Sequence, residues 1–137
     1  MDENIYFEIS NAGNYVRLCP FIASKRIFDN DWIKTSVELK GDCFTGSYTI
    51  ELQTENYVRL QQDINSLYNN MDGAVSFNDL EECLIIKLSG NGTGQFLVNI
   101  IAQNYLNDAK LSFTFSIDQS YIQGLVNQLY KINKALK

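Results

Sequence analysis

Two short acidic segments, FDNDW and NDLEE, carry the side chains of this sequence that are best suited to chemistry. Their carboxylates belong to Asp29, Asp31, Asp79, Glu81 and Glu82. Two carboxylates can act as the acid and the nucleophile of a glycosidase, but that reaction needs a sugar-binding cleft with several aromatic side chains, which no pattern here indicates. A calcium loop would alternate its acids as D-x-D-x-D-G, and neither segment does so.

Two interpretations of these acids remain, namely solvated loop residues and a contact surface for a basic protein. Both segments place their acids beside an apolar or aromatic residue, Trp32 in one and Leu80 in the other. That arrangement is typical of the polar rim around an apolar anchor of an interface. We therefore take the five acids as candidate partner-binding residues, with solvated loops as the alternative.

The rest of the sequence favours a protein without catalytic residues, cofactor or metal. It contains no histidine, which removes the commonest general base and most transition-metal sites. The segment SGNGTG, at 89–94, resembles a phosphate loop, but it lacks the lysine and leads into a strand instead of a helix. Cys19, Cys43 and Cys83 are widely spaced, as expected for reduced thiols outside a zinc site or disulfide framework.

Charge and hydropathy restrict the partners and the compartment. The formal net charge is −5, from 16 acids and 11 bases. An acidic chain repels phosphate backbones, so we expect a basic protein as the partner and not a nucleic acid. The same acidity could simply keep a domain soluble.

The start, MDENIYFEIS, lacks the features of a signal peptide, and no segment approaches the ~20 apolar residues of a membrane span. We therefore expect a cytoplasmic protein that does not bind membranes.

Hydrophobic periodicity predicts eight strands and two helices. Period-two alternation predicts strands at 5–10, 14–21, 32–40, 43–53, 74–77, 83–90, 95–103 and 110–117. Apolar residues spaced by three and four predict helices at 54–71 and 118–136. Thr54 and Asp118 are the expected N-caps, and Gly124, within the second helix, could mark close packing against another element.

The segment from Ser47 to Tyr68 returns at an offset of 65 residues as Ser112 to Asn133, without a gap. Each half of the chain thus consists of four strands and a helix, with pseudo-repeats at about 1–72 and 73–137. We expect one domain over 1–137 and an α+β fold: about eight mostly antiparallel strands in one curved sheet, with both helices on one face. The shared positions carry serine, threonine and apolar residues, so the repeat indicates architecture and not a duplicated active site.

The chain also resembles a known family in a series of short motifs, in order from about Trp32 to Leu129. These motifs are DW, FTGSY, LQTENY, LY, GAVSF, LSGNGTG, LSFTF and DQSYI. In this order they are similar to those of WapI-type immunity proteins. The resemblance implies a small cytoplasmic bacterial protein that binds and blocks the toxic C-terminal domain of a secreted contact-dependent toxin, often a nuclease. It implies no particular binding residues.

Three hypotheses of function follow. The first is an inhibitory protein for a cognate toxin domain that is basic, because nuclease active sites hold phosphates. The second is a non-catalytic module that binds a small molecule or a carbohydrate on a concave sheet face. The third is an enzyme that depends on carboxylates. A toxin gene next to the gene of this protein would favour the first, and a ligand that raises the melting temperature would favour the second.

Overall fold

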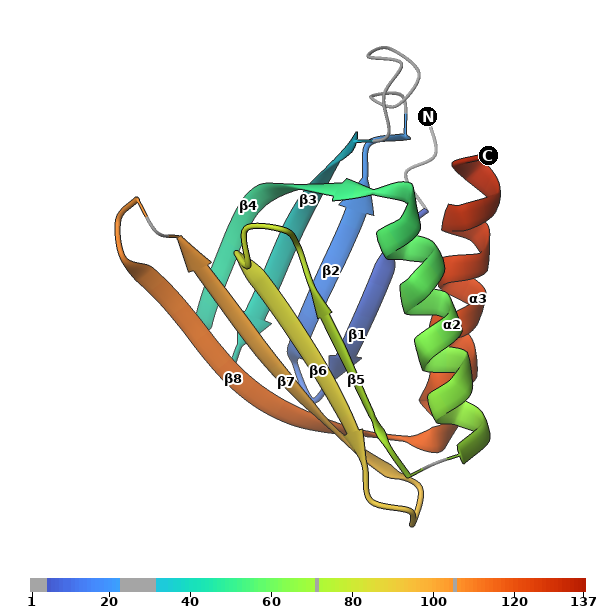
Figure 1. The fold of residues 1–137 in the computed structure, drawn as a ribbon. Helices are drawn as coiled ribbons and strands as arrows, with labels where there is room; N and C mark the ends of the chain where they lie inside the picture. Colours follow the sequence, from blue (N-terminus) through green and yellow to red (C-terminus); the bar gives the residue numbers. More distant parts are fainter. Residues whose placement is uncertain (1–4, 23–31, 71, 105) are drawn as a thin grey trace.

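The computed structural model describes residues 5–22, 32–70, 72–104 and 106–137. Its first half consists of β1 (Phe7–Asn11), β2 (Asn14–Pro20), β3 (Trp32–Gly41), β4 (Phe44–Gln53) and α2 (Thr54–Asn70). The second half repeats this order with β5 (Ala74–Asn78), β6 (Leu84–Gly90), β7 (Gln95–Asn104), β8 (Ala109–Asp118) and α3 (Gln119–Ala135). The predicted order of strands and helices is therefore confirmed, and Figure 1 shows the two helices side by side.

The strands form two antiparallel four-stranded sheets, which corrects the prediction of one curved sheet. Within the described residues, the orders are β1-β2-β3-β4 and β5-β6-β7-β8. The reason is that Gln53 ends β4 and Thr54 begins α2 without an intervening loop. The 17 residues of α2 carry the chain about 25 Å away before β5 begins. The strands β4 and β5 therefore lie at the edges of different sheets, and the strands of the two sheets run in different directions (Figure 1).

The two helices bury equivalent faces, as the repeat predicted. In α2 the buried residues include Leu60, Ile64 and Leu67, and their counterparts in α3 are Leu125, Leu129 and Ile132. The helices pack against each other and against the inner faces of the sheets, so all six side chains enter one continuous core. An apolar stripe repeated every three or four residues forms a helix of this kind because burial of the stripe stabilises it.

The ends of the helices differ from each other. Asp118 is the N-cap of α3, where its Oδ1 accepts hydrogen bonds from the backbone N–H of Ser120 (3.0 Å) and from the Ser120 hydroxyl. The predicted cap of α2 is wrong: Thr54 lies within the helix, and its buried hydroxyl has no hydrogen-bond partner. Asn56 Oδ1 instead accepts the N–H of Gln53 at 2.7 Å.

The sheets contact each other closely where β8 crosses β3. A Cβ atom added to Gly41 would lie 2.5 Å from Cγ of Phe113, so only glycine allows this approach. Hydrogen bonds also join the two halves of the chain: Tyr48 on β4 donates one of 2.7 Å to the carbonyl of Cys83, and Asn11 Nδ2 donates one of 2.6 Å to the carbonyl of Ser116. Gly124, by contrast, is exposed and has nothing within 4 Å of an added Cβ, so it does not mark close packing.

These two glycines predict opposite effects of the same substitution. Gly41→Ala should lower the free energy of unfolding by about 1–3 kcal/mol, because the new methyl group overlaps the Phe113 ring and the core must shift. Gly124→Ala should raise it by up to about 1 kcal/mol, because alanine is favoured over glycine inside a helix and meets no obstacle. Urea denaturation of the two variants measures both values. Equal effects of the two substitutions would contradict the described contact between the sheets.

The buried Tyr57 and the partly buried Tyr48 predict a loss of stability in alkali. Burial raises the pKa of the Tyr57 hydroxyl, which shares a hydrogen bond of 2.8 Å with Thr35 Oγ1, and burial and then the nearby Asp79 raise that of Tyr48. In the unfolded chain both hydroxyls ionise near pH ~10. The folded chain keeps these protons to higher pH, so their contribution to stability is complete below pH ~10 and is lost as the pH rises toward the folded-state values. Between pH ~9 and ~11 the unfolding free energy of Tyr57→Phe should fall less than that of the wild type.

Candidate partner-binding site

The acids predicted at 79–82 lie in the loop between β5 and β6, but they have different environments. Asp79 is only 4% exposed, and its Oδ1 accepts the N–H of Leu84 at 2.9 Å. Its carbonyl accepts the N–H of Glu82 at 3.0 Å. Asp79 therefore closes the loop, and its burial argues against a place on the rim of an interface. Glu81 and Glu82 are exposed.

The exposed part of this loop presents an apolar side chain next to two acids. Leu80 is 79% exposed and directly precedes Glu81 and Glu82. The loop is held in place from two sides, since Gln103 Nε2 donates to the carbonyl of Glu82 at 2.7 Å and Tyr48 donates to that of Cys83. A held loop of this composition suits contact with a partner, because its side chains lose little conformational freedom on binding.

The other predicted acids, Asp29 and Asp31, lie outside the described residues, so the structure does not place them relative to the β5–β6 loop. They stay a prediction. Burial raises the pKa of the nearby Cys83 thiol, with Asp79 and Glu81 adding to the effect, which disfavours the thiolate and hence a nucleophilic role for this cysteine.

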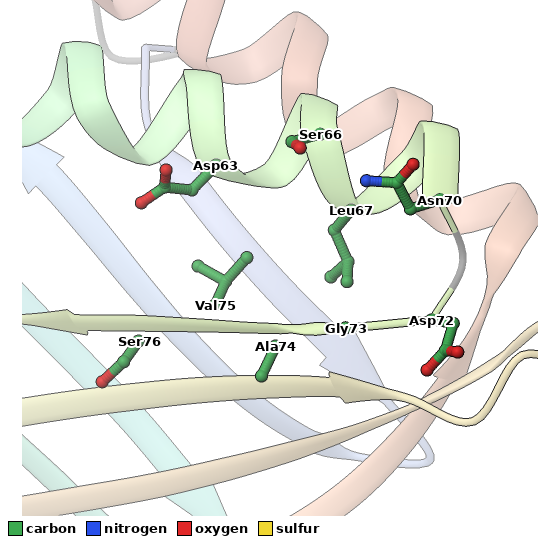
Figure 2. A pocket seen from close by; sticks show the side chains of 9 residues that line it. All are labelled: Asp63, Ser66, Leu67, Asn70, Asp72, Gly73, Ala74, Val75 and Ser76. Atoms are coloured by element: carbon green, nitrogen blue, oxygen red, sulfur yellow. The ribbon is translucent and has the colours of Figure 1, made fainter.

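A groove between α2 and β5, which the sequence did not predict, adjoins the β5–β6 loop at Asn78, where β5 ends. Its larger part is a hollow of about 240 Å³. Figure 2 shows Asp63 reaching from α2 toward β5, while Leu67 of α2 and Val75 of β5 point into the gap from opposite sides. The lining residues are Asp63, Ser66, Leu67, Asn70, Asp72, Gly73, Ala74, Val75 and Ser76.

A smaller hollow of about 80 Å³ continues the larger one toward the β5–β6 loop, and the two share Asp63 and Ser76. Its lining residues are Asn56, Arg59, Leu60, Asp63, Ser76, Phe77 and Asn78. We call the two hollows together the α2–β5 groove. Its acids are Asp63 and Asp72, and the cation Arg59 is paired with Glu55 across 2.9 Å, so the groove can attract a cationic side chain.

A signal for this groove exists in the sequence. The residues at 56, 59, 63, 66 and 70 follow the same spacing of three and four as the buried stripe, and all of them are polar. A polar stripe is the usual solvated face of an amphipathic helix, so only the position of β5 shows that this stripe forms one wall of a groove.

A third hollow, of about 280 Å³, lies between the two sheets. Its walls come from β3 and β4 on one side and from β7 and β8 on the other, with Leu39, Tyr48, Ala102 and Leu111 among the lining residues. It is the most apolar of the three hollows described, and a small molecule would bind here.

No three His, Cys, Asp or Glu side chains are grouped to hold a metal ion in the described part of the chain. Among the same residues, no helix is both long and apolar enough to cross a bilayer.

These features define a small α+β protein with two four-stranded antiparallel sheets, an acidic groove and an exposed acidic loop. The chain belongs to the Immunity protein WapI-like family, whose family model matches residues 2–137. The resemblance found in the sequence is therefore confirmed over essentially the whole chain. No curated protein matches it.

Several solved structures share the fold at low sequence identity. WHY1 from Arabidopsis thaliana is 11% identical, with a TM-score of 0.53, and the match covers 96% of this chain and 84% of that one. WHY3 from the same plant is 12% identical, with a TM-score of 0.50 and coverage of 96% and 88%. The plant transcriptional regulator PBF-2 is 11% identical, with a TM-score of 0.51 and coverage of 96% and 81%. At such identities the likeness concerns the fold alone.

The two environments in the β5–β6 loop predict different effects on stability. Asp79→Ala should lower the free energy of unfolding by about 1–3 kcal/mol, because it leaves the buried N–H of Leu84 without its acceptor. Glu81→Ala should change it by less than about 0.5 kcal/mol, because that side chain is exposed. Thermal or urea unfolding measures both. If Asp79→Ala left the free energy of unfolding unchanged, Asp79 would again be a candidate for contact with a partner.

Proposed function

We propose that this chain is a cytoplasmic immunity protein that binds and neutralises the C-terminal toxin domain of a cognate secreted bacterial toxin. The observation that carries the proposal is membership of the Immunity protein WapI-like family over residues 2–137. The function needs binding and no catalysis, which agrees with a sequence that lacks histidine.

The chemistry of the surface supports a basic toxin domain, such as a nuclease. A nuclease holds phosphates, so its active site and substrate channel are electropositive, and an acidic protein can occupy them through charge complementarity. Leu80 would act as an apolar anchor in this complex, with Glu81 and Glu82 on the rim. The acids of the α2–β5 groove, Asp63 and Asp72, extend the acidic surface from this loop.

The charge distribution gives no comparable support for nucleic acid as the direct partner. The net charge is −5. On the outer face of the first sheet, Arg17 pairs with Glu8 at 2.6 Å and with Glu38 at 3.2 Å, and it lies 5.2 Å from the centre of the Tyr6 ring. A cation neutralised in this way contributes little attraction to phosphates.

A second candidate function is the binding of a small apolar molecule, and the hollow of about 280 Å³ between the sheets favours it. A screen of small molecules and sugars by thermal shift separates the two functions. If a small molecule raised the melting temperature and no toxin domain bound the protein, the second function would replace the first.

The proposed rim predicts an effect of charge on the rate of association. Glu81→Lys should slow binding to the toxin domain at low salt and weaken its salt dependence, because rim acids act mainly through electrostatic steering. The steering should fade between 0.1 M and 1 M salt, as the Debye length falls from ~10 Å to ~3 Å. Surface-plasmon kinetics with the toxin domain encoded beside this gene measure both rates.

The matched control is Glu51→Lys, which changes the net charge equally on an exposed position of β4. An equal effect of the two variants would show that only net charge matters and that the loop is not the rim. The pair Asp29→Lys/Asp31→Lys tests the other predicted acidic segment in the same assay. If no toxin domain encoded nearby binds the wild-type chain, the proposed function is wrong.

A further inference from the structure

The two halves of the protein place the same pair of elements side by side, a helix and the first strand of a sheet. The helix α3, from the second half, lies against β1 of the first sheet, and α2, from the first half, lies against β5 of the second (Figure 1). Both strands stand at the edge of their sheet. An edge strand presents backbone N–H and C=O groups that another strand can pair with, so a folded protein normally blocks them.

The edge of β1 is blocked by α3. Phe7 and Ile9 pair with β2, so the alternation of an antiparallel ladder turns the backbone groups of Glu8 and Ser10 outward. The N–H of Glu8 donates to Gln128 Oε1 at 2.9 Å. The N–H of Ser10 donates to the hydroxyl of Tyr121 at 3.2 Å. Side chains of α3 thus satisfy the outward donors of this strand.

The edge of β5 has the same geometry. Gly90 donates its N–H to the carbonyl of Gly73 at 2.8 Å, and the register then turns the backbone groups of Ser76 and Asn78 away from β6. Among the described residues, neither of these outward N–H groups has a hydrogen-bond partner. Both residues line the α2–β5 groove.

The repeat explains why this second edge is open. At the offset of 65 residues, Gln128 corresponds to Asp63 and Tyr121 corresponds to Asn56. Both counterparts in α2 have shorter side chains, and Asn56 Oδ1 is already used to accept the N–H of Gln53. The space that the longer side chains fill beside β1 is, beside β5, the α2–β5 groove.

We propose that the outer edge of β5 is the docking strand for the toxin domain, which adds an extended segment to the sheet in the α2–β5 groove. This inference rests on the proposed function. The segment would pair its backbone with Ser76 and Asn78, a mode of recognition in which main-chain hydrogen bonds supply affinity and neighbouring side chains supply specificity. A lysine or arginine of the segment would face Asp63 and Asp72.

The acids that flank this edge also select its occupant. A second copy of this chain would bring its own Asp63 and Asp72 against them, and its net charge is −5, so charge repulsion opposes pairing between copies. A basic segment meets no such repulsion. The edge is thereby kept open for a cationic partner and protected from self-association.

The substitution Ser76→Pro tests the docking strand directly. Proline removes the outward N–H and fills its place, and a strand edge tolerates it because that N–H takes no part in the β5–β6 ladder. We expect Ser76→Pro to weaken affinity for the toxin domain by at least about tenfold. The matched control Ser76→Ala keeps the N–H and loses only the hydroxyl, and it should bind within about twofold of the wild type. Circular dichroism verifies that both variants are folded.

A second variant tests the same edge from the helix. Asp63→Gln introduces the counterpart of Gln128, whose amide oxygen accepts the outward N–H of the facing strand. It should also weaken toxin binding by at least about tenfold, through the blocked edge and the lost acid. In the complex with the wild-type chain, hydrogen exchange of the Ser76 and Asn78 amides should slow, while that of the already bonded Glu8 and Ser10 amides stays unchanged.

The outcomes separate the docking site from the proposed function. Wild-type affinity of both folded variants, or unchanged exchange at Ser76 and Asn78 in the complex, would overturn the docking strand and leave the immunity function intact. A wild-type chain that binds no toxin domain encoded nearby would overturn both. A homodimer of the wild-type chain that Ser76→Pro dissociates would overturn the toxin as the occupant of this edge.

Discussion

The contact between α2 and α3 holds the two halves of this protein together. Each helix follows one sheet in the chain and lies beside the first strand of the other, so neither half can bury its apolar stripe without the other. Hydrogen bonds also join the two helices, because Asn133 Nδ2 of α3 donates to the carbonyl of Tyr57 at 3.2 Å and to Gln61 Oε1 at 2.7 Å. Because the stabilising burial spans both halves, we expect the repeat to unfold cooperatively as one unit.

The near-symmetry of the halves makes their differences informative. The equivalent positions in the buried stripes of the two helices are apolar in both halves, so these positions are explained by packing of the core. At the two sheet edges the equivalence fails, since glutamine and tyrosine on α3 give way to aspartate and asparagine on α2. A change from long to short polar side chains removes no apolar contact from the core, yet it opens a strand edge, which is costly to leave unprotected in a small protein. The asymmetry therefore lies where a binding function would place it.

The fold and the family carry different information about this protein. Structures with the same arrangement of strands and helices include a plant transcriptional regulator at 11% identity, and a shared fold at such a distance transmits no function. The family match covers residues 2–137 and points to immunity. The β5–β6 loop and the α2–β5 groove adjoin each other along one strand, so a single partner can contact both.

The sequence by itself determined the eight strands, the two helices, the repeat and the buried stripes, because local periodicity and capping residues such as Asp118 specify these without long-range information. It also excluded histidine-based chemistry. Whether the strands formed one sheet or two was decided only by the tertiary structure, because alternation fixes which face of a strand is buried but not which strand lies next to it. The same limit applies to the sites. The letters of NDLEE do not distinguish the buried Asp79 from the exposed Glu81, and the polar stripe of α2 becomes the wall of a groove only because folding brings β5 beside it.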